Sequence, residues 1–262
     1  MFLNVNDAEF YVEETGQGKT VVLVHGNMQD IHTWDEQVET LSFGYHTVVY
    51  DIRGTGKSSR LPNMPFSHVA DLEGIFNSLG ITDAYLIGVS LGGLLATNFA
   101  QKHPHRISGL VLVSSDLVGG PVSPDYVRFL ASLKLAIRTG GIEKAEQRYL
   151  NSPLLKAPMS KPKVAAKIKH MLEGYHWELF LENAPNGLMK PISRLELPEI
   201  KAPTEVIYGE KDIENFKSNA RILSAEIRDA GLIEMKGCGH FPHLESPDEF
   251  NLNVIKFFDS IR

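Results

Sequence analysis

Five short runs of apolar and β-branched residues constrain this chain more than any other feature. They cover residues 20–24, 47–50, 84–87, 110–113 and 205–208. Continuous runs of this kind are typical of strands that are covered on both faces of a sheet. Helical patterns separate or follow them, at about residues 35–41, 69–79, 91–103, 218–228 and 247–261. The alternation predicts an α/β fold, with a mostly parallel sheet and helices on both faces.

One long stretch breaks the alternation. Residues 2–6 and 8–14 read as a hairpin and residues 231–235 as a last strand, but residues 117–194 contain no convincing strand. Ser123-Pro124 is typical of a helix start, with a capping serine followed by proline at the first helical position. Ser160 and Pro162 predict the start of another helix. We interpret residues 117–194 as a helical cap inserted into a core of residues 1–116 and 195–262. The alternative is a third helical layer of the core.

The composition excludes several classes of function. Lysine and arginine number 26 and aspartate and glutamate 32, so the net charge is −6 and a basic nucleic-acid-binding face is not expected. The single cysteine, Cys238, excludes an internal disulfide and an all-cysteine metal site. The start of the chain has no leader pattern, and no apolar run is long enough to cross a membrane. We therefore expect a cytoplasmic protein, whose oligomeric state the sequence does not indicate.

The segment Gly88-Val89-Ser90-Leu91-Gly92 carries the strongest chemical signal. It is a G-x-S-x-G pattern between a predicted strand and a predicted helix. A sharp turn there would hold Ser90 in a strained conformation above the sheet, and side chains at the glycine positions would collide with the turn. The pattern predicts a nucleophilic serine at the start of a helix, whose N-terminus favours developing negative charge.

A second signal, Gly237-Cys238-Gly239-His240, follows the last predicted strand. A neutral imidazole at this edge of the sheet could take the serine proton and return it to the leaving group. His243 is the rival base, and a purely structural loop histidine is the other alternative. We favour His240, because the two glycines before it allow a tight turn.

Two aspartates compete to orient that histidine. Asp212 follows the strand at residues 205–208, and Asp116 follows the strand at residues 110–113. Both strand ends open on the same edge of a parallel sheet, so either carboxylate could reach the imidazole. Both aspartates lie between Ser90 and His240 in the chain, so the order serine, acid, histidine fits either one. We favour Asp212, because Asp116 lies where the chain leaves for the predicted cap and can cap or hinge that segment instead.

The loop His25-Gly26-Asn27-Met28 follows the first core strand. A backbone N–H from this loop, with Asn27 as the best candidate, can join the N–H of Leu91 to hold an oxyanion. We interpret His25 as a buried histidine that braces the loop.

These four segments together resemble the α/β-hydrolase superfamily over nearly the whole chain. Residues 51–58 resemble its D-x-R-G-x-G-x-S loop, and residues 197–203 resemble the segment that leads from the cap into the penultimate strand. The resemblance implies an eight-stranded, mostly parallel sheet with one antiparallel strand near the start and a helical cap after the sixth strand. It assigns nucleophile, acid and base to Ser90, Asp212 and His240, the oxyanion amides to Asn27 and Leu91, and structural roles to Asp51, Arg53 and Ser58.

Single residues narrow the activity within that superfamily. Ser90 stands where dehalogenases and epoxide hydrolases have aspartate, although the Asn27 loop resembles that of dehalogenases. Carbon–carbon bond hydrolases usually have tryptophan at the position of Phe241, and proline iminopeptidases at that of Leu91. A serine hydrolase of small to medium acyl esters, lactones or thioesters remains, with a small-molecule substrate and no cofactor or metal.

Alternatives to this activity stay open. The same fold can transfer acyl groups or cleave carbon–carbon bonds, and a ligand receptor of this fold can keep the triad with little turnover. The residues that line the acyl pocket are equally open, because each candidate can instead be a packing residue. The candidates are Met28, Tyr149, Met171, Trp177, Phe180 and Phe241.

Overall fold

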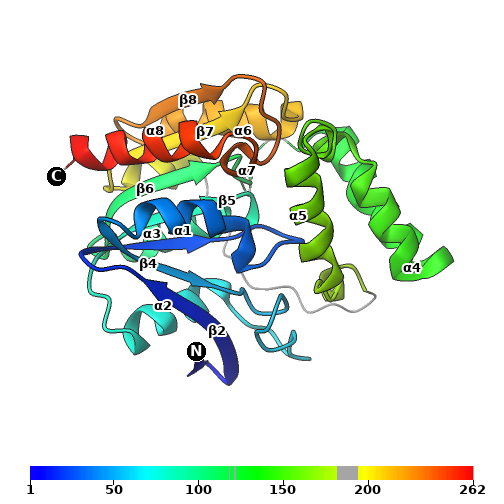
Figure 1. Cartoon of the computed structure of the whole chain (residues 1–262), viewed down its shortest axis with the longest axis horizontal. Coiled ribbons are helices and arrows are strands. Elements are labelled where there is room, and N and C mark those ends of the chain that lie inside the picture. The colour runs from blue at the N-terminus through cyan, green and yellow to red at the C-terminus, as the bar shows by residue number, and fades with distance from the viewer. Residues whose placement is uncertain (118, 121, 182–193, 262) are drawn as a thin grey trace.

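An eight-stranded sheet runs through the molecule (Figure 1). The computed structural model describes residues 1–117, 119–120, 122–181 and 194–261. The strands are β1 (Phe2–Val5), β2 (Ala8–Thr15), β3 (Lys19–Val24), β4 (Tyr45–Tyr50), β5 (Ala84–Val89), β6 (Ile107–Val113), β7 (Thr204–Gly209) and β8 (Gly231–Met235). Each predicted strand is present, and the observed bounds extend most of them by one to three residues.

The strand order is β1-β2-β4-β3-β5-β6-β7-β8. β2 pairs antiparallel with both β1 and β4, and every pairing from β4 to β8 is parallel. The sheet therefore has one antiparallel strand near the start, as the superfamily resemblance implies. Its parallel part brings the carboxyl ends of six strands to one edge, where ligands of such sheets bind.

Helices cover both faces because side chains alternate along each buried strand. On β3, Val21 and Leu23 face one apolar cluster, and Val22 and Val24 face the other. The first cluster includes residues of α1 (Asp35–Leu41) and α8 (Pro247–Ser260), and the second includes residues of α2 (His68–Ser78), α3 (Leu91–Lys102) and α6 (Glu214–Glu226). The short α7 (Pro242–Glu245) and η1 (Ile31–Trp34) lie in loops at the carboxyl edge.

The described residues between β6 and β7 form helices joined by loops and no strand. It contains α4 (Pro124–Leu150), η2 (Pro153–Leu155), η3 (Pro158–Ser160), α5 (Pro162–Glu173) and η4 (Glu178–Phe180), and η5 (Arg194–Glu199) leads into β7. Figure 1 shows α4 and α5 together at one side of the sheet. Residues 118, 121 and 182–193 of the predicted cap lie outside the described residues, and its division from the core stays a prediction.

Two helix starts in this segment illustrate how local sequence acts. The Ser123 hydroxyl accepts a hydrogen bond from the Tyr126 amide and caps α4, as Ser123-Pro124 predicts. At α5 the residue before the helix is Lys161, and the Ser160 hydroxyl instead donates to the Ala157 carbonyl. Among the described helices, none is long and apolar enough to cross a membrane.

Candidate active site

Residues from five different strand ends lie at the carboxyl edge of the sheet. His25 follows β3, Ser90 follows β5, Asp116 comes shortly after β6, Asp212 after β7 and His240 after β8. Residues far apart in the chain thus come together at this edge, and the largest separation is the 215 positions from His25 to His240. All of them come from loops that rigid strands position.

Ser90 has the backbone conformation that the G-x-S-x-G pattern predicts. Its φ and ψ are 54° and −115°, which is strained for a residue with a side chain. A Cβ on Gly88 would lie 2.3 Å from the Gly92 carbonyl oxygen, and one on Gly92 would lie 2.2 Å from the Val24 carbonyl oxygen. Both positions therefore require glycine, because a larger residue at either would push the turn apart.

The imidazole of His240 is bonded to Asp212. Nδ1 of His240 lies 2.9 Å from Oδ2 of Asp212, and the two side chains are 2% and 0% exposed. The second carboxylate oxygen, Oδ1, accepts the amide of Ile213 at 2.8 Å. The Phe216 ring packs against the imidazole, with ring centres 4.2 Å apart. This leaves Nε2 as the ring nitrogen that can exchange a proton with a substrate or nucleophile.

Asp116 is close to this pair but is bonded differently. Its carboxylate accepts the amide of Leu117 at 3.0 Å, and its own amide donates to the Ser90 carbonyl at 3.1 Å. Burial raises the pKa of the Asp116 carboxyl, while the nearby His240 acts to lower it. The geometry thus favours Asp212 over Asp116 as the acid that orients His240.

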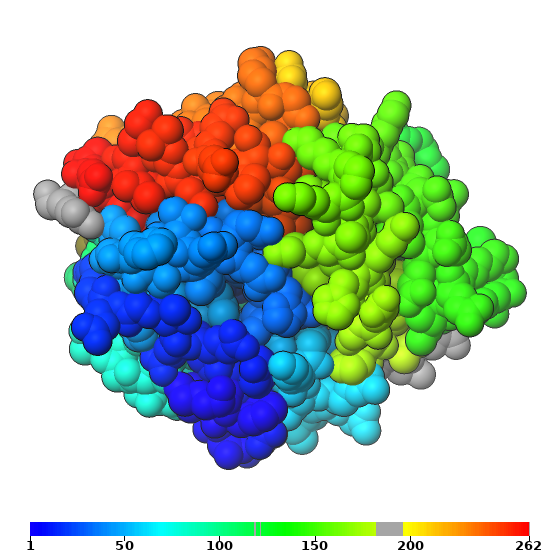
Figure 2. Space-filling view, viewed as in Figure 1, coloured from blue at the N-terminus to red at the C-terminus, as the bar shows by residue number. Residues whose placement is uncertain are grey.

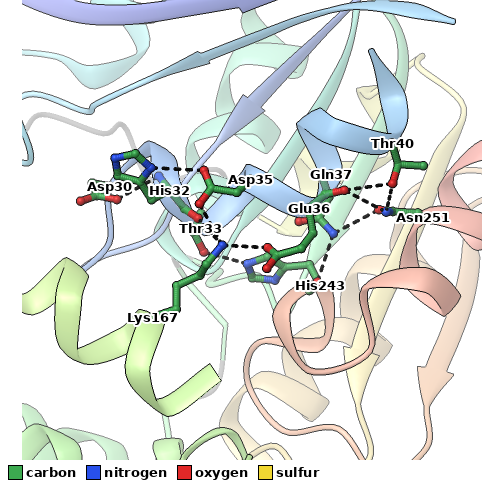
Figure 3. A network of polar contacts seen from close by, with 10 residues as sticks. All are labelled: Asp30, His32, Thr33, Asp35, Glu36, Gln37, Thr40, Lys167, His243 and Asn251. Carbon is green, nitrogen blue, oxygen red and sulfur yellow. Dashed lines mark hydrogen bonds and ion pairs between the residues drawn. The ribbon is translucent and has the colours of Figure 1, made fainter. Parts of the chain in front are cut away.

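His243, the rival base, is turned toward the helices on one face of the sheet (Figure 3). Its Nε2 lies 2.9 Å from the Thr33 hydroxyl, its backbone carbonyl accepts Gln37, and its ring packs on Trp34 with centres 4.5 Å apart. Burial holds the pKa of His243 well below its usual value. It is therefore a neutral packing residue, and the structure favours His240 as the base.

The loop after β3 is fixed by internal hydrogen bonds. The amide of Ile52 donates to Nε2 of His25 at 2.9 Å, and Nδ1 lies 2.8 Å from the Gly26 carbonyl. Burial lowers the pKa of His25 to about 4, so the ring stays neutral and can accept that bond. His25 thus braces the loop, as predicted.

Asn27 links this loop to the helical segment. Its side-chain oxygen accepts the Met28 amide at 3.1 Å and the Tyr175 hydroxyl at 2.6 Å. Within the described part of the chain, neither the Asn27 amide nor the Leu91 amide hydrogen bonds to another backbone carbonyl outside helices and strands. Both amides are therefore available for the predicted oxyanion role.

The six predicted pocket residues all lie in one apolar cluster. They are at most 7% exposed and pack with residues of α1, α5 and α8, and they are Met28, Tyr149, Met171, Trp177, Phe180 and Phe241. Packing alone accounts for such burial, so their contact with a substrate stays a prediction. A hollow of about 640 Å³ opens between α4 and the start of α6, and none of the six lines it.

Three other predicted residues have structural partners only. The Asp51 carboxylate accepts the amides of Ile31 and Lys57, Arg53 pairs with the Asp71 carboxylate, and the Ser58 hydroxyl accepts the Tyr11 amide. These bonds knit the loop after β4 to its surroundings, as the resemblance implies.

Four residues that sequence reasoning missed tie the helical segment to the site. They are Tyr175, Lys161, Lys167 and Glu245. Lys167 on α5 bonds to Asp35 and Glu36 of α1 at 2.9 and 2.8 Å (Figure 3), and Figure 2 shows the α5 surface lying against that region. Tyr175, Lys161 and Lys167 stand in no motif. Only Glu245, five residues after His240, has a fixed spacing that could have drawn attention.

Comparisons with known proteins agree with this architecture. Residues 19–247 match the family described as alpha/beta hydrolase fold. The chain is 28% identical to a pimeloyl-[acyl-carrier protein] methyl ester esterase of Chromobacterium violaceum, over 92% of this chain and 94% of the relative. It is 30% identical to a 2-hydroxy-6-oxononadienedioate/2-hydroxy-6-oxononatrienedioate hydrolase of Cupriavidus pinatubonensis, over 96% and 91%.

One solved structure is similar to this chain over almost the entire length of both. The enol-lactonase of Burkholderia xenovorans LB400 superposes with a TM-score of 0.82 and 26% identity, covering 99% of this chain and 100% of that one. The order and direction of the strands described above are thus those of a known hydrolase fold.

Proposed function

The chain belongs to the α/β-hydrolase family, and from this premise we propose that it is a serine hydrolase of small to medium carboxylic esters, lactones or thioesters. The observation that carries the proposal is the 2.9 Å contact between His240 and Asp212, at the sheet edge where Ser90 occupies a strained turn. A buried imidazole with a carboxylate on Nδ1 has the tautomer that a general base needs at Nε2.

The reaction proceeds through an acyl-enzyme. Ser90 Oγ attacks the carbonyl carbon while His240 Nε2 accepts its proton, and Asp212 stabilises the imidazolium. The amides of Asn27 and Leu91 hold the oxyanion of the tetrahedral intermediate. The imidazolium then protonates the leaving group, and His240 activates water, which releases the acid and restores Ser90.

The helical segment takes the role of a cap in this proposal. Residues 117–194 would cover the acyl group, with Tyr149, Met171, Trp177 and Phe180 as the side chains that contact it. The Tyr175–Asn27 bond supports this position, because it joins the segment to the loop that carries the proposed oxyanion donor.

Ester chemistry is supported by the named activities of two similar proteins, a methyl ester esterase and an enol-lactonase. A carbon–carbon bond hydrolase of the same fold is the second candidate, which the 30% identity to the 2-hydroxy-6-oxo acid hydrolase favours. Phe241 argues against it, since those enzymes usually have tryptophan there.

Product analysis in ¹⁸O-labelled water tests the proposal. Wild type and Ser90→Ala are incubated with aryl esters of graded chain length, lactones and a 2-hydroxy-6-oxo acid, with and without an added alcohol. Hydrolysis of esters or lactones by wild type alone, with ¹⁸O in the released acid, supports the proposal. Cleavage of the oxo acid alone would replace it by the second candidate, and a new ester formed with the alcohol would indicate acyl transfer.

A further inference from the structure

The loop that carries His240 is held by a second carboxylate, that of Glu245. The amides of Gly239 and Phe241, the residues on either side of His240, both donate to Glu245 Oε1, at 2.9 and 3.1 Å. Gly239 also lies 2.9 Å from Oε2. Two backbone donors on one charged acceptor fix the Cys238–Gly239 and His240–Phe241 peptide planes, one on each side of the His240 amide.

This carboxylate is fully enclosed, with 0% of the Glu245 side chain exposed. Burial raises the pKa of its carboxyl, whereas the Gly239 and Phe241 amides and the charges of Lys161 and His240 act to lower it. A buried carboxylate is retained only where such partners compensate the lost hydration. The contacts of Glu245 therefore indicate a specific role for its carboxylate.

Lys161 brings the helical segment to the same place. Its Nζ donates to the Glu245 carbonyl at 2.8 Å and lies 3.8 Å from Oε2. Lys161 stands between η3 and α5, so its partner on the His240 loop is 84 residues away in sequence.

Close packing around Gly239 adds to this link. A Cβ on Gly239 would lie 2.8 Å from the Ala157 side chain and 2.9 Å from Pro158. The His240 loop at Gly239 therefore has no room to shift toward η3 unless that part of the helical segment moves with it.

We propose that Glu245 is a positioning residue for His240 and that Lys161 couples it to the seating of the α4–α5 segment. This inference rests on the proposed function, since it assigns a task to the same base. Glu245 acts through the two amides and through its negative charge, which favours the imidazolium that forms during the reaction. Lys161 partly neutralises that charge when the segment is seated.

The two charges have opposite effects on the pH at which the base becomes active. Removing a negative charge near an imidazole disfavours its protonated form, and removing a positive charge favours it. The other ionisable groups around His240 are Asp212, Asp116 and the buried His243, and they remain in every variant. A change in packing alone would not give shifts of opposite sign.

The rate of covalent labelling by a fluorophosphonate, measured from pH 5 to 9, tests the inference without a known substrate. For Glu245→Gln we expect a plateau about tenfold lower and a midpoint lower by roughly half a pH unit. For Lys161→Met we expect the midpoint to rise. In the double variant we expect the effect of Lys161→Met to be smaller than in the single variant, because the Glu245 charge that Lys161 partly neutralises is gone.

Glu249→Gln and Lys163→Met are matched controls, because these exposed side chains lie four and two residues away and do not contact the His240 loop. Wild-type profiles for Glu245→Gln would overturn the positioning role. A midpoint that falls or stays fixed in Lys161→Met, which is half-exposed and should fold, would overturn the coupling. A wild-type protein that is not labelled would overturn the proposed function itself.

Discussion

The strand-end loops and the helices between β6 and β7 are held in place by different means. In the loops, backbone bonds dominate: the Asp212 amide donates to the Gly209 carbonyl at 3.0 Å and the Lys211 amide to the Cys238 carbonyl at 2.7 Å. The helices reach the loops through single side chains, such as Tyr175 and Lys167, besides apolar packing.

The difference separates two kinds of contribution to catalysis. A side chain held by backbone bonds at the end of a rigid strand keeps its geometry when a single contact from the helices is lost. A contact made by one tyrosine or lysine can be lost without disturbing the sheet. We therefore expect substitutions of Ser90, Asp212 and His240 at the strand ends to abolish chemistry and substitutions in the helical segment to tune it.

The largest expected effect separates the two aspartates at the sheet edge. Asp212→Asn should lower kcat by about 10⁴, because an amide mis-sets the tautomer of His240. Asp116→Asn should stay within about tenfold of wild type, since its carboxylate is bonded to Leu117 and not to His240. The measurement is kcat on an activated aryl ester. Reversed results would make Asp116 the acid.

The pH dependence of kcat should come from His240 alone. Burial lowers the pKa of His25 and of His68 to about 4 and holds that of His243 well below its usual value, so all three stay neutral above pH 5. Protonation disables a histidine that acts as general base, so kcat should rise from pH 5 to a plateau at higher pH. A profile that is flat from pH 5 to 9 would count against His240.

Tyr175→Phe tests the helical side of the comparison. Loss of the 2.6 Å bond to Asn27 should lower kcat about tenfold, less than the 10²–10³ expected for removal of an oxyanion donor itself. Tyr11→Phe, which loses a hydroxyl bond to Glu13 away from the site, is the control. A loss as large as that of Asp212→Asn would erase the distinction between the two regions.

Cys238→Ser should have the smallest effect, with kcat within about twofold of wild type, a change of less than 1 kcal/mol in the activation free energy. Burial raises the pKa of the Cys238 thiol to about 11, so it is protonated at neutral pH and a poor nucleophile. Its backbone carbonyl, which accepts the Lys211 amide, is unchanged by the substitution. Strong inactivation would show that this free thiol takes part in the chemistry.

The same difference governs what the sequence could predict. Ser90, Asp212 and His240 follow predicted strands within a few residues, so the topology of a parallel sheet brings them to one edge. Helix α1 has its predicted bounds. Helix α6 begins at Glu214, four residues before the predicted start. The sequence does not mark this start, because Ile213, the residue before the helix, has no side chain that can cap it.

The contacts of the helical segment carry no comparable local signal. The kink in α4 arises at Gly140 and Gly141, and Gly141 has a φ of 75°, but a glycine pair alone does not fix a bend. Tyr175 meets Asn27 across 148 residues, and no spacing predicts such a pairing. Trp177 and Phe180 are plausible pocket residues by sequence because they are aromatic, but residues that only pack in the core share this property.

Mass spectrometry after reaction with a fluorophosphonate tests the central claim most directly. The account predicts one adduct per chain, on the peptide that contains Ser90, and no adduct in a folded Ser90→Ala variant. An adduct on another residue, or labelling that persists in Ser90→Ala, would contradict the assignment of Ser90 as the nucleophile.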